Sequence, residues 1–241
     1  MSPFAAATRS VLVVQPDHED PLDTFDSWFR DEGLTTKVVR PFADDPVPDV
    51  ADAAGLVVLG GDMGANDDAA HPWLRDVRAL LASAVEHDVP TLGICLGGQL
   101  LAVATGGEVS RGSHGTEVGA PQIHARPEVE DDVLLSAVSW PARFATMHRD
   151  EIVTLPAEAV WLAESSMYKH QAFRIGRHAW GLQFHPEVSL SRFVRWAEYI
   201  HDDPETTQRV QKGVAEFAAT TRYVATATEP LARRFARVVR S

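Results

Sequence analysis

The sequence predicts an α/β fold with an open, mostly parallel sheet and helices on both of its faces. Two observations support this prediction. Short apolar runs at residues 11–14, 56–59 and 91–94 contain almost no polar side chains, which is typical of strands buried on both faces. Segments with helical spacing lie between these runs, and such alternation indicates parallel βαβ units.

The first half of the chain supplies the parallel strands and their crossover helices in regular order. Strands are expected at residues 10–15, 35–39, 56–59 and 91–94. Apolar residues recur every three or four positions in the segments between them, as on the buried face of a helix. The helices expected from this spacing cover residues 21–32, 73–87 and 96–105.

The second half of the chain is more mixed. Short β-like runs at residues 152–155 and 160–163 predict antiparallel additions to the sheet within residues 108–180. Three helices are expected after them: residues 190–200, residues 205–220 after a break at 202–204, and a segment that follows Pro230. We expect these helices to pack on the sheet edge as additional core, the alternative being a surface for a partner or a second copy.

Composition and charge exclude several classes of protein. The 241 residues carry a net charge of −12, which argues against general nucleic-acid binding because that binding depends on neutralising phosphates. No apolar run reaches the ~20 residues of a membrane-spanning helix. Residues 1–10 lack the pattern of a signal peptide. A single cysteine forms no internal disulfide, so we expect a cytoplasmic protein.

Cys95, the single cysteine, lies where a strand-like run meets a helix-like run. Gly93 and Gly97 stand two positions before and two positions after it. A nucleophile on a sharp strand-to-helix turn needs this spacing, because glycine avoids steric clashes there. The amino-terminal end of the following helix also favours the thiolate. The pattern therefore indicates a nucleophile, the alternative being an inert buried cysteine.

A base for this nucleophile is predicted at His185. An apolar run at residues 180–184 precedes it, and Pro186 ends the strand. A histidine at the end of a core strand lies at the carboxyl edge of the sheet, where sites form in open α/β proteins. Glu187 can accept a hydrogen bond from one imidazole nitrogen and favour the imidazolium. Together with Cys95, these residues predict a Cys-His-Glu triad.

With these motifs, the chain resembles the class I glutamine amidotransferases over about residues 10–190. That family carries its cysteine in a Gly-x-Cys-x-Gly-x-Gln turn and a His-x-Glu motif near the end of the domain. Further landmarks of the family occur in its order, at residues 59–64, 71–74, 117–119, 147–150, 155–156 and 171–174. The likeness is greatest to stand-alone proteins similar to the glutaminase part of GMP synthase. The chain departs from the family at Asp62, where proline is common, and at Gly98, where relatives often carry a larger residue.

The resemblance implies a flavodoxin-like domain over residues 1–190, with residues 191–241 as a helical extension packed on the same domain. It implies that Cys95 attacks the side-chain amide of glutamine and forms a γ-glutamyl thioester. His185 then protonates the leaving ammonia and activates the water that hydrolyses the thioester.

The resemblance also implies how the substrate is held. The backbone N–H groups of Gly61 and Leu96 are the expected oxyanion hole. From the residues alone, Gly60 and Gly61 could equally form an ordinary tight turn. Gln99 lies one helical turn after Cys95, so it could contact the substrate's α-groups or merely a nearby loop. Residues 148–150 are expected as a loop that shapes the pocket. The substrate-binding residues that the resemblance implies are Gly60, Gln99, Met147, His148 and Arg149.

No cofactor or metal is expected. The ten histidines form no His-Glu-x-x-His pair, and neither nucleotide-binding glycine motif occurs. Such a chain could release ammonia but could not adenylate an acceptor. The expected partners are glutamine or another γ-glutamyl compound as substrate, and a synthetase subunit or a second copy of the chain, with neither nucleic acid nor membrane.

Three functions remain open at this point. The leading hypothesis is a glutaminase-type amidotransferase. The second is a γ-glutamyl peptidase or hydrolase, which would use the same triad on other γ-glutamyl amides. The third is a non-catalytic or redox-sensing protein on a similar sheet, which the joint presence of Cys95, His185 and Glu187 disfavours.

Overall fold

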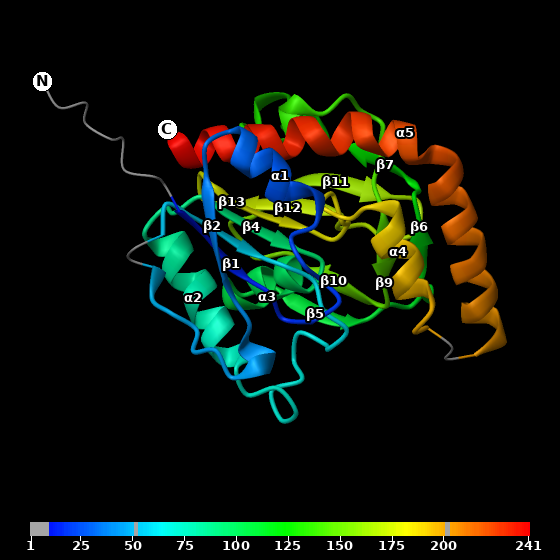
Figure 1. Ribbon diagram of the computed structural model, residues 1–241, viewed down its shortest axis with the longest axis horizontal. Helices are drawn as coiled ribbons and strands as arrows, with labels where there is room; N and C mark the ends of the chain where they lie inside the picture. Colours follow the sequence, from blue (N-terminus) through cyan, green and yellow to red (C-terminus); the bar gives the residue numbers. More distant parts are fainter. Residues whose placement is uncertain (1–9, 51–52, 201–202) are drawn as a thin grey trace, which may run out of the picture.

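The computed structural model describes residues 10–50, 53–200 and 203–241 (Figure 1). Within them, a nine-stranded sheet has the order β2-β1-β3-β4-β13-β12-β11-β7-β8. The parallel strands are β1 (Ser10–Val14), β2 (Thr35–Val39), β3 (Gly55–Val58), β4 (Thr91–Ile94) and β13 (Ala179–Leu182). Their order is that of a flavodoxin-like sheet, so the predicted fold class is confirmed.

Antiparallel strands extend this sheet, as predicted for residues 108–180. They are β12 (Ala172–Ile175), β11 (Val160–Ser165), β7 (Gln122–Ala125) and β8 (Ala142–Arg143). Two small antiparallel pairs lie outside it: β5 (Glu108–Arg111) with β10 (Asp150–Thr154), and β6 (Glu117–Gly119) with β9 (Thr146–His148). The predicted loop over residues 148–150 is therefore wrong, because β6 and β5 hold His148 and Asp150 in strands and leave only Arg149 between them.

Helices cover both faces of the central sheet. They are α1 (Thr24–Asp31), α2 (Leu74–Glu86), α3 (Leu96–Ala104) and α5 (Pro204–Arg240). In β1, Val11 and Val13 face the core formed with α1 and α5, whereas Leu12 and Val14 face α2 and α3. The continuous apolar run of β1 follows from this burial on two sides. Figure 1 shows α1 lying beside the carboxyl-terminal half of α5.

The predicted ends of the helices shift by a few residues. The helix expected over residues 21–32 begins at Thr24, because Asp23 has φ 44° and cannot belong to a right-handed helix. Three short 3₁₀ helices that were not predicted occupy Pro41–Ala43, Pro127–Asp131 and Leu135–Ala137.

The carboxyl-terminal region has two helices, not the three predicted. α4 covers Leu190–Ala197, and α5 continues through Pro230. A proline inside a helix removes one hydrogen bond and costs ~3 kcal/mol. Thr228 and Leu231 are buried on either side of it, so packing along the whole segment outweighs that cost. Of the predicted break, residue 202 lies outside the described residues, while Asp203 caps α5 by accepting a hydrogen bond from the Thr206 N–H at 2.9 Å.

The second half of α5 packs on a face of the sheet and not on its edge. Phe235 is fully buried, with its ring centroid 5.9 Å from that of Phe29 and 6.5 Å from that of Trp180. The first half packs on α4, where the rings of Phe217 and Phe193 are 5.0 Å apart. We therefore propose that residues 191–241 fold as one unit with residues 1–190.

Membrane insertion of a helix finds no candidate in the described part of the chain: none of its helices is long and apolar enough to cross a bilayer.

Replacing Phe235 with alanine tests this packing. Because the ring is buried against both α1 and the sheet, we expect the free energy of unfolding in urea to fall by about 3–5 kcal/mol. Tyr223→Ala, on an exposed part of the same helix, should change it by less than about 0.5 kcal/mol. A separate early transition for α5, or equal effects of the two substitutions, would show that α5 is not part of the core.

Candidate active site

Cys95 stands at the sharp turn between β4 and α3. Its backbone has φ 51° and ψ −106°, a conformation that costs a non-glycine residue about 1–3 kcal/mol. The Cys95 N–H donates a hydrogen bond to the Leu182 carbonyl at 2.7 Å, which ties the turn to β13. The turn therefore has the strained geometry that was predicted for a nucleophile.

Glycines around the turn allow α3 to approach the backbone of three strands. A Cβ at Gly93 would overlap the Gly97 carbonyl, and one at Gly97 would overlap the Val58 carbonyl. At Gly98 a Cβ would come within 2.7 Å of the Leu182 carbonyl oxygen. This close approach explains why glycine stands at position 98, where relatives often carry a larger residue.

The three predicted triad residues come together at the carboxyl edge of the sheet. His185 Nδ1 and Glu187 Oε1 are 2.8 Å apart, and both side chains are buried. The Cys95 side chain hydrogen-bonds the same imidazole, which leaves Nε2 as the ring nitrogen that serves the sulfur. Gln183 Nε2 also donates toward Cys95 Sγ at 3.7 Å.

Neighbouring elements hold the histidine and its carboxylate in place. The His185 N–H donates to the Ala145 carbonyl at 2.7 Å. At the start of α1, the Thr24 hydroxyl donates to the Glu187 carbonyl at 2.6 Å. The Trp196 ring of α4 lies edge-on to the imidazole, with centroids 4.8 Å apart. These contacts fix the ring orientation that a general base needs.

The charge of the imidazole is set by its buried neighbours. Burial disfavours the imidazolium, but the Glu187 carboxylate and the Cys95 side chain together raise the pKa of His185 well above 6.5. The folded protein therefore holds an imidazolium beside the sulfur. Because the pKa is raised by folding, the stability that this charge contributes is complete below about pH 6.5 and is lost as the pH rises through the folded-state value.

The predicted oxyanion loop lies directly against the triad. A Cβ at Gly60 would lie 2.9 Å from His185 Cε1, and one at Gly61 would lie 3.0 Å from Leu96 Cδ2. As the first residue of α3, Leu96 has an N–H without an acceptor inside the helix. The loop and the helix start are thus close enough for their N–H groups to face one bound oxygen.

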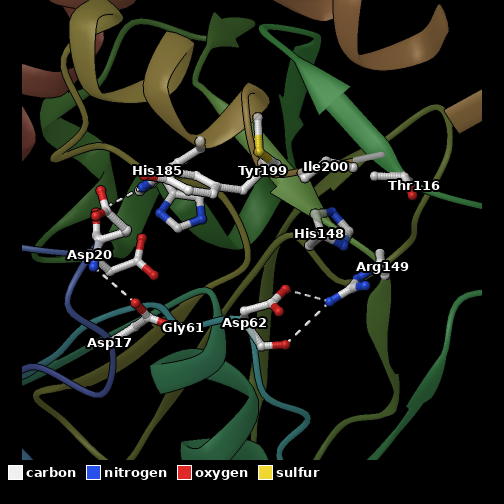
Figure 2. Close-up of a pocket in the computed structure, with 13 residues that line it drawn as sticks. Asp17, Asp20, Gly61, Asp62, Thr116, His148, Arg149, His185, Tyr199 and Ile200 are labelled. Atoms are coloured by element: carbon white, nitrogen blue, oxygen red, sulfur yellow. Dashed lines mark hydrogen bonds and ion pairs between the residues drawn. The ribbon is translucent and has the colours of Figure 1, made fainter. Parts of the chain in front are cut away.

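Two adjoining cavities lie beside the triad and share Gly61, Asp62 and residues 147–149. The first, of about 290 Å³, is also lined by Asp20, His185, Trp196 and Tyr199. Figure 2 shows Asp20 and His185 on one side of this cavity, opposite His148 and Arg149. The second, of about 390 Å³, is lined mainly by polar residues and reaches Gln99.

Gln99 makes internal contacts in this structure. Its side chain is buried, and Nε2 donates to Gln183 Oε1 at 3.2 Å and to the Asp150 carbonyl at 3.3 Å. The alternative in which Gln99 bonds a neighbouring segment therefore describes the structure, and its contact with a substrate stays a prediction. Met147 and Arg149 line both cavities, as does His148.

His148 belongs to a second buried His-Glu pair. Its Nε2 is 2.8 Å from Glu117 Oε2, and its Nδ1 is 2.9 Å from the Asp150 carbonyl oxygen. Glu117 also accepts hydrogen bonds from Ser165 Oγ and Gln171 Nε2, both at 2.6 Å. Both ring nitrogens of His148 are therefore engaged, so His148 is no rival base for Cys95. The landmarks at Glu117, His148 and Gln171 form one network that supports the cavity wall.

Several residues of the site were not predicted. Asp62 pairs with Arg149 across the cavity mouth, which Figure 2 shows by dashed lines. Asp20 lies in an acid-rich loop, and no local pattern distinguishes it from its neighbours. Gln183 did carry a usable signal, because it is a polar residue inside an otherwise apolar run. Among the described residues, no group of three or more potential ligands could hold a metal ion.

Comparison with known proteins agrees with this arrangement. A family model described as "Glutamine amidotransferase class-I" matches residues 26–196. The glutamine-hydrolyzing subunit of GMP synthase from Archaeoglobus fulgidus is 38% identical over 165 residues, 68% of this chain and 81% of that protein. Gamma-glutamyl peptidase 5 from Arabidopsis thaliana is 29% identical over 191 residues, 76% of this chain and 74% of that protein. A crystal structure of a glutamine amidotransferase from Thermotoga maritima, 25% identical, superposes with a TM-score of 0.83 over 98% of this chain and 100% of that chain.

Replacing Glu187 with glutamine tests the electrostatics of the site. Without the carboxylate, the imidazolium is less favoured and stabilises a thiolate less well. We expect alkylation of Cys95 by iodoacetamide at pH 7 to slow by about tenfold or more, which corresponds to ~1.4 kcal/mol. As the only cysteine, Cys95 makes the readout by mass spectrometry unambiguous. The exposed Glu158→Gln should react like the wild type; equal rates for all three proteins would refute this account.

Proposed function

The chain belongs to the class I glutamine amidotransferase family, and we propose that it hydrolyses the side-chain amide of glutamine through a γ-glutamyl thioester on Cys95. The observation that supports this most directly is the convergence of Cys95, His185 and Glu187 at a strained strand-to-helix turn. The family and its relatives are glutamine-hydrolysing enzymes, so the reaction class follows from the comparisons and the mechanism from the geometry.

The proposed reaction has two halves. The Cys95 thiolate attacks the amide carbon, and Gly61 and Leu96 donate hydrogen bonds to the oxygen that becomes negative. His185 gives its Nε2 proton to the nitrogen, and ammonia leaves. The neutral imidazole then accepts a proton from water, which attacks the thioester and releases glutamate. Glu187 keeps Nε2 directed at the reacting atoms throughout.

The ammonia requires an acceptor that this chain does not supply. Relatives are named as a subunit of GMP synthase, which supports a synthetase as the partner. The sequence has neither of the two nucleotide-binding glycine motifs, in keeping with a division of labour between subunits. We propose a synthetase partner in the cytoplasm, with a homodimer as the alternative assembly.

The γ-glutamyl peptidase from Arabidopsis thaliana supports a second candidate function. The same thioester chemistry would cleave other γ-glutamyl amides, provided that the cavity accepts a larger leaving group. The apolar rings of Trp196 and Tyr199, which line the cavity that contains His185, offer a surface for such a group.

The glutaminase function predicts ammonia release from glutamine by the wild type and its loss in Cys95→Ala. The expected loss is at least about a thousandfold, because no other side chain can form the thioester. The assay should be run with and without a candidate synthetase subunit. Equal ammonia release by the wild type and Cys95→Ala would refute the proposal.

A panel of donors separates the two functions. If the protein is a glutaminase, kcat/KM should be highest for L-glutamine. If γ-glutamyl dipeptides and γ-glutamyl anilides react at least tenfold faster, the peptidase function is correct. All activities must disappear in Cys95→Ala for either assignment to stand.

A further inference from the structure

Asp20 is a buried carboxyl in the proposed active site for which the mechanism above gives no role. It is 9% exposed and lines the cavity that contains His185 and Gly61. Figure 2 shows it beside the imidazole, on the side of the cavity away from Arg149. A carboxyl group in this position can contact a bound substrate.

The Asp20 carboxyl also lacks a partner within the described part of the chain. No hydrogen bond or ion pair reaches its side chain from those residues, although burying such a group without a partner is costly. The other three carboxylates that line the cavity each have one. They are Asp17, which accepts the Glu19 N–H, Glu19, which pairs with Arg192 and Arg195, and Asp62, which pairs with Arg149.

The position of Asp20 relative to His185 indicates what it would contact. A Cβ placed on Gly60 would lie 2.9 Å from His185 Cε1 and 3.6 Å from Asp20 Oδ1. The carboxyl group is therefore next to the ring carbon that joins the two imidazole nitrogens. Nδ1 is engaged by Glu187, so the proton for the leaving group must come from Nε2. A nitrogen within hydrogen-bond reach of Nε2 lies on the same side of the ring system as Asp20.

We propose that the Asp20 carboxylate accepts a hydrogen bond from the leaving nitrogen of the γ-glutamyl donor, an inference that rests on the thioester mechanism proposed above. When the C–N bond of the tetrahedral adduct breaks, its electron pair remains on nitrogen. That nitrogen takes the Nε2 proton of His185, and the oxyanion re-forms the carbonyl. Asp20 forms no covalent bond; it stabilises the N–H groups as the nitrogen gains positive character.

The protonation state of Asp20 gives this contact a pH dependence. Burial raises the pKa of Asp20 to about 7; His185 opposes this shift, and Asp17, Glu187 and Asp62 add to it. The carboxylate is therefore available above about pH 7. Because folding raises this pKa from 3.8, the group lowers stability as the pH rises between these two values. Asp20→Asn removes that penalty, so its melting temperature at pH 8 should exceed that of the wild type.

Two donors that differ in the leaving atom test the proposal. L-Glutamine has N–H groups to donate, whereas the γ-methyl ester of L-glutamate forms the same thioester but has an oxygen leaving group. At pH 8 we expect Asp20→Asn to lower kcat/KM for glutamine by at least about tenfold and to change that for the ester by less than about twofold. Asp17→Asn, which removes an equal charge from the same cavity, should change both by less than about twofold. In the wild type, the ratio of glutamine to ester kcat/KM should rise as the pH passes 7, and in Asp20→Asn it should stay constant.

Each contrary outcome identifies what is wrong. Equal losses on both donors would show that Asp20 acts through His185 or the fold, and unchanged glutamine hydrolysis would show that it makes no contact; either result overturns the proposal. A melting temperature at or above that of the wild type verifies that the variant is folded. If the wild type hydrolyses neither donor, or Cys95→Ala hydrolyses both, the thioester mechanism itself fails and the role of Asp20 fails with it.

Discussion

The close packing of α3 on the backbone of three strands is the constraint on which the site depends. Only glycine at positions 93, 97 and 98 permits that packing, and it forces Cys95 into a conformation that costs about 1–3 kcal/mol. The buried strands β3, β4 and β13 hold the turn in place, so the surrounding core offsets this strain. As a result the thiol, the start of a helix and the end of β13 all meet at one edge of the sheet.

Two buried His-Glu pairs stand on opposite sides of the cavity and have different surroundings. His185 and Glu187 adjoin the sulfur, and folding raises the pKa of this histidine. His148 and Glu117 instead belong to a closed network with Ser165 that supports the wall formed by β9. The first pair has a reactive neighbour, and the second has only structural ones. A buried histidine beside a glutamate thus says little about chemistry until the partner of its other nitrogen is known.

The parts of the structure that the sequence predicted are those with a local signal. Buried parallel strands are continuous apolar runs, and the Cys95 turn carries its glycines within two residues. The single helix α5 was missed because its continuity through Pro230 depends on burial of both flanks against the rest of the protein. The pairing of Asp62 with Arg149 and the isolation of Asp20 depend on segments distant in the chain. No periodicity or spacing could have indicated them.

The central claim is that Cys95, activated by His185 and Glu187, is the residue that attacks a γ-glutamyl carbon. A diazoketone analogue of glutamine, which alkylates an attacking nucleophile, tests this directly by peptide mass spectrometry. The account predicts one adduct, on Cys95, that forms more slowly in the presence of glutamine and in Glu187→Gln. An adduct on another residue, or labelling of Cys95 that neither glutamine nor Glu187→Gln slows, would contradict it.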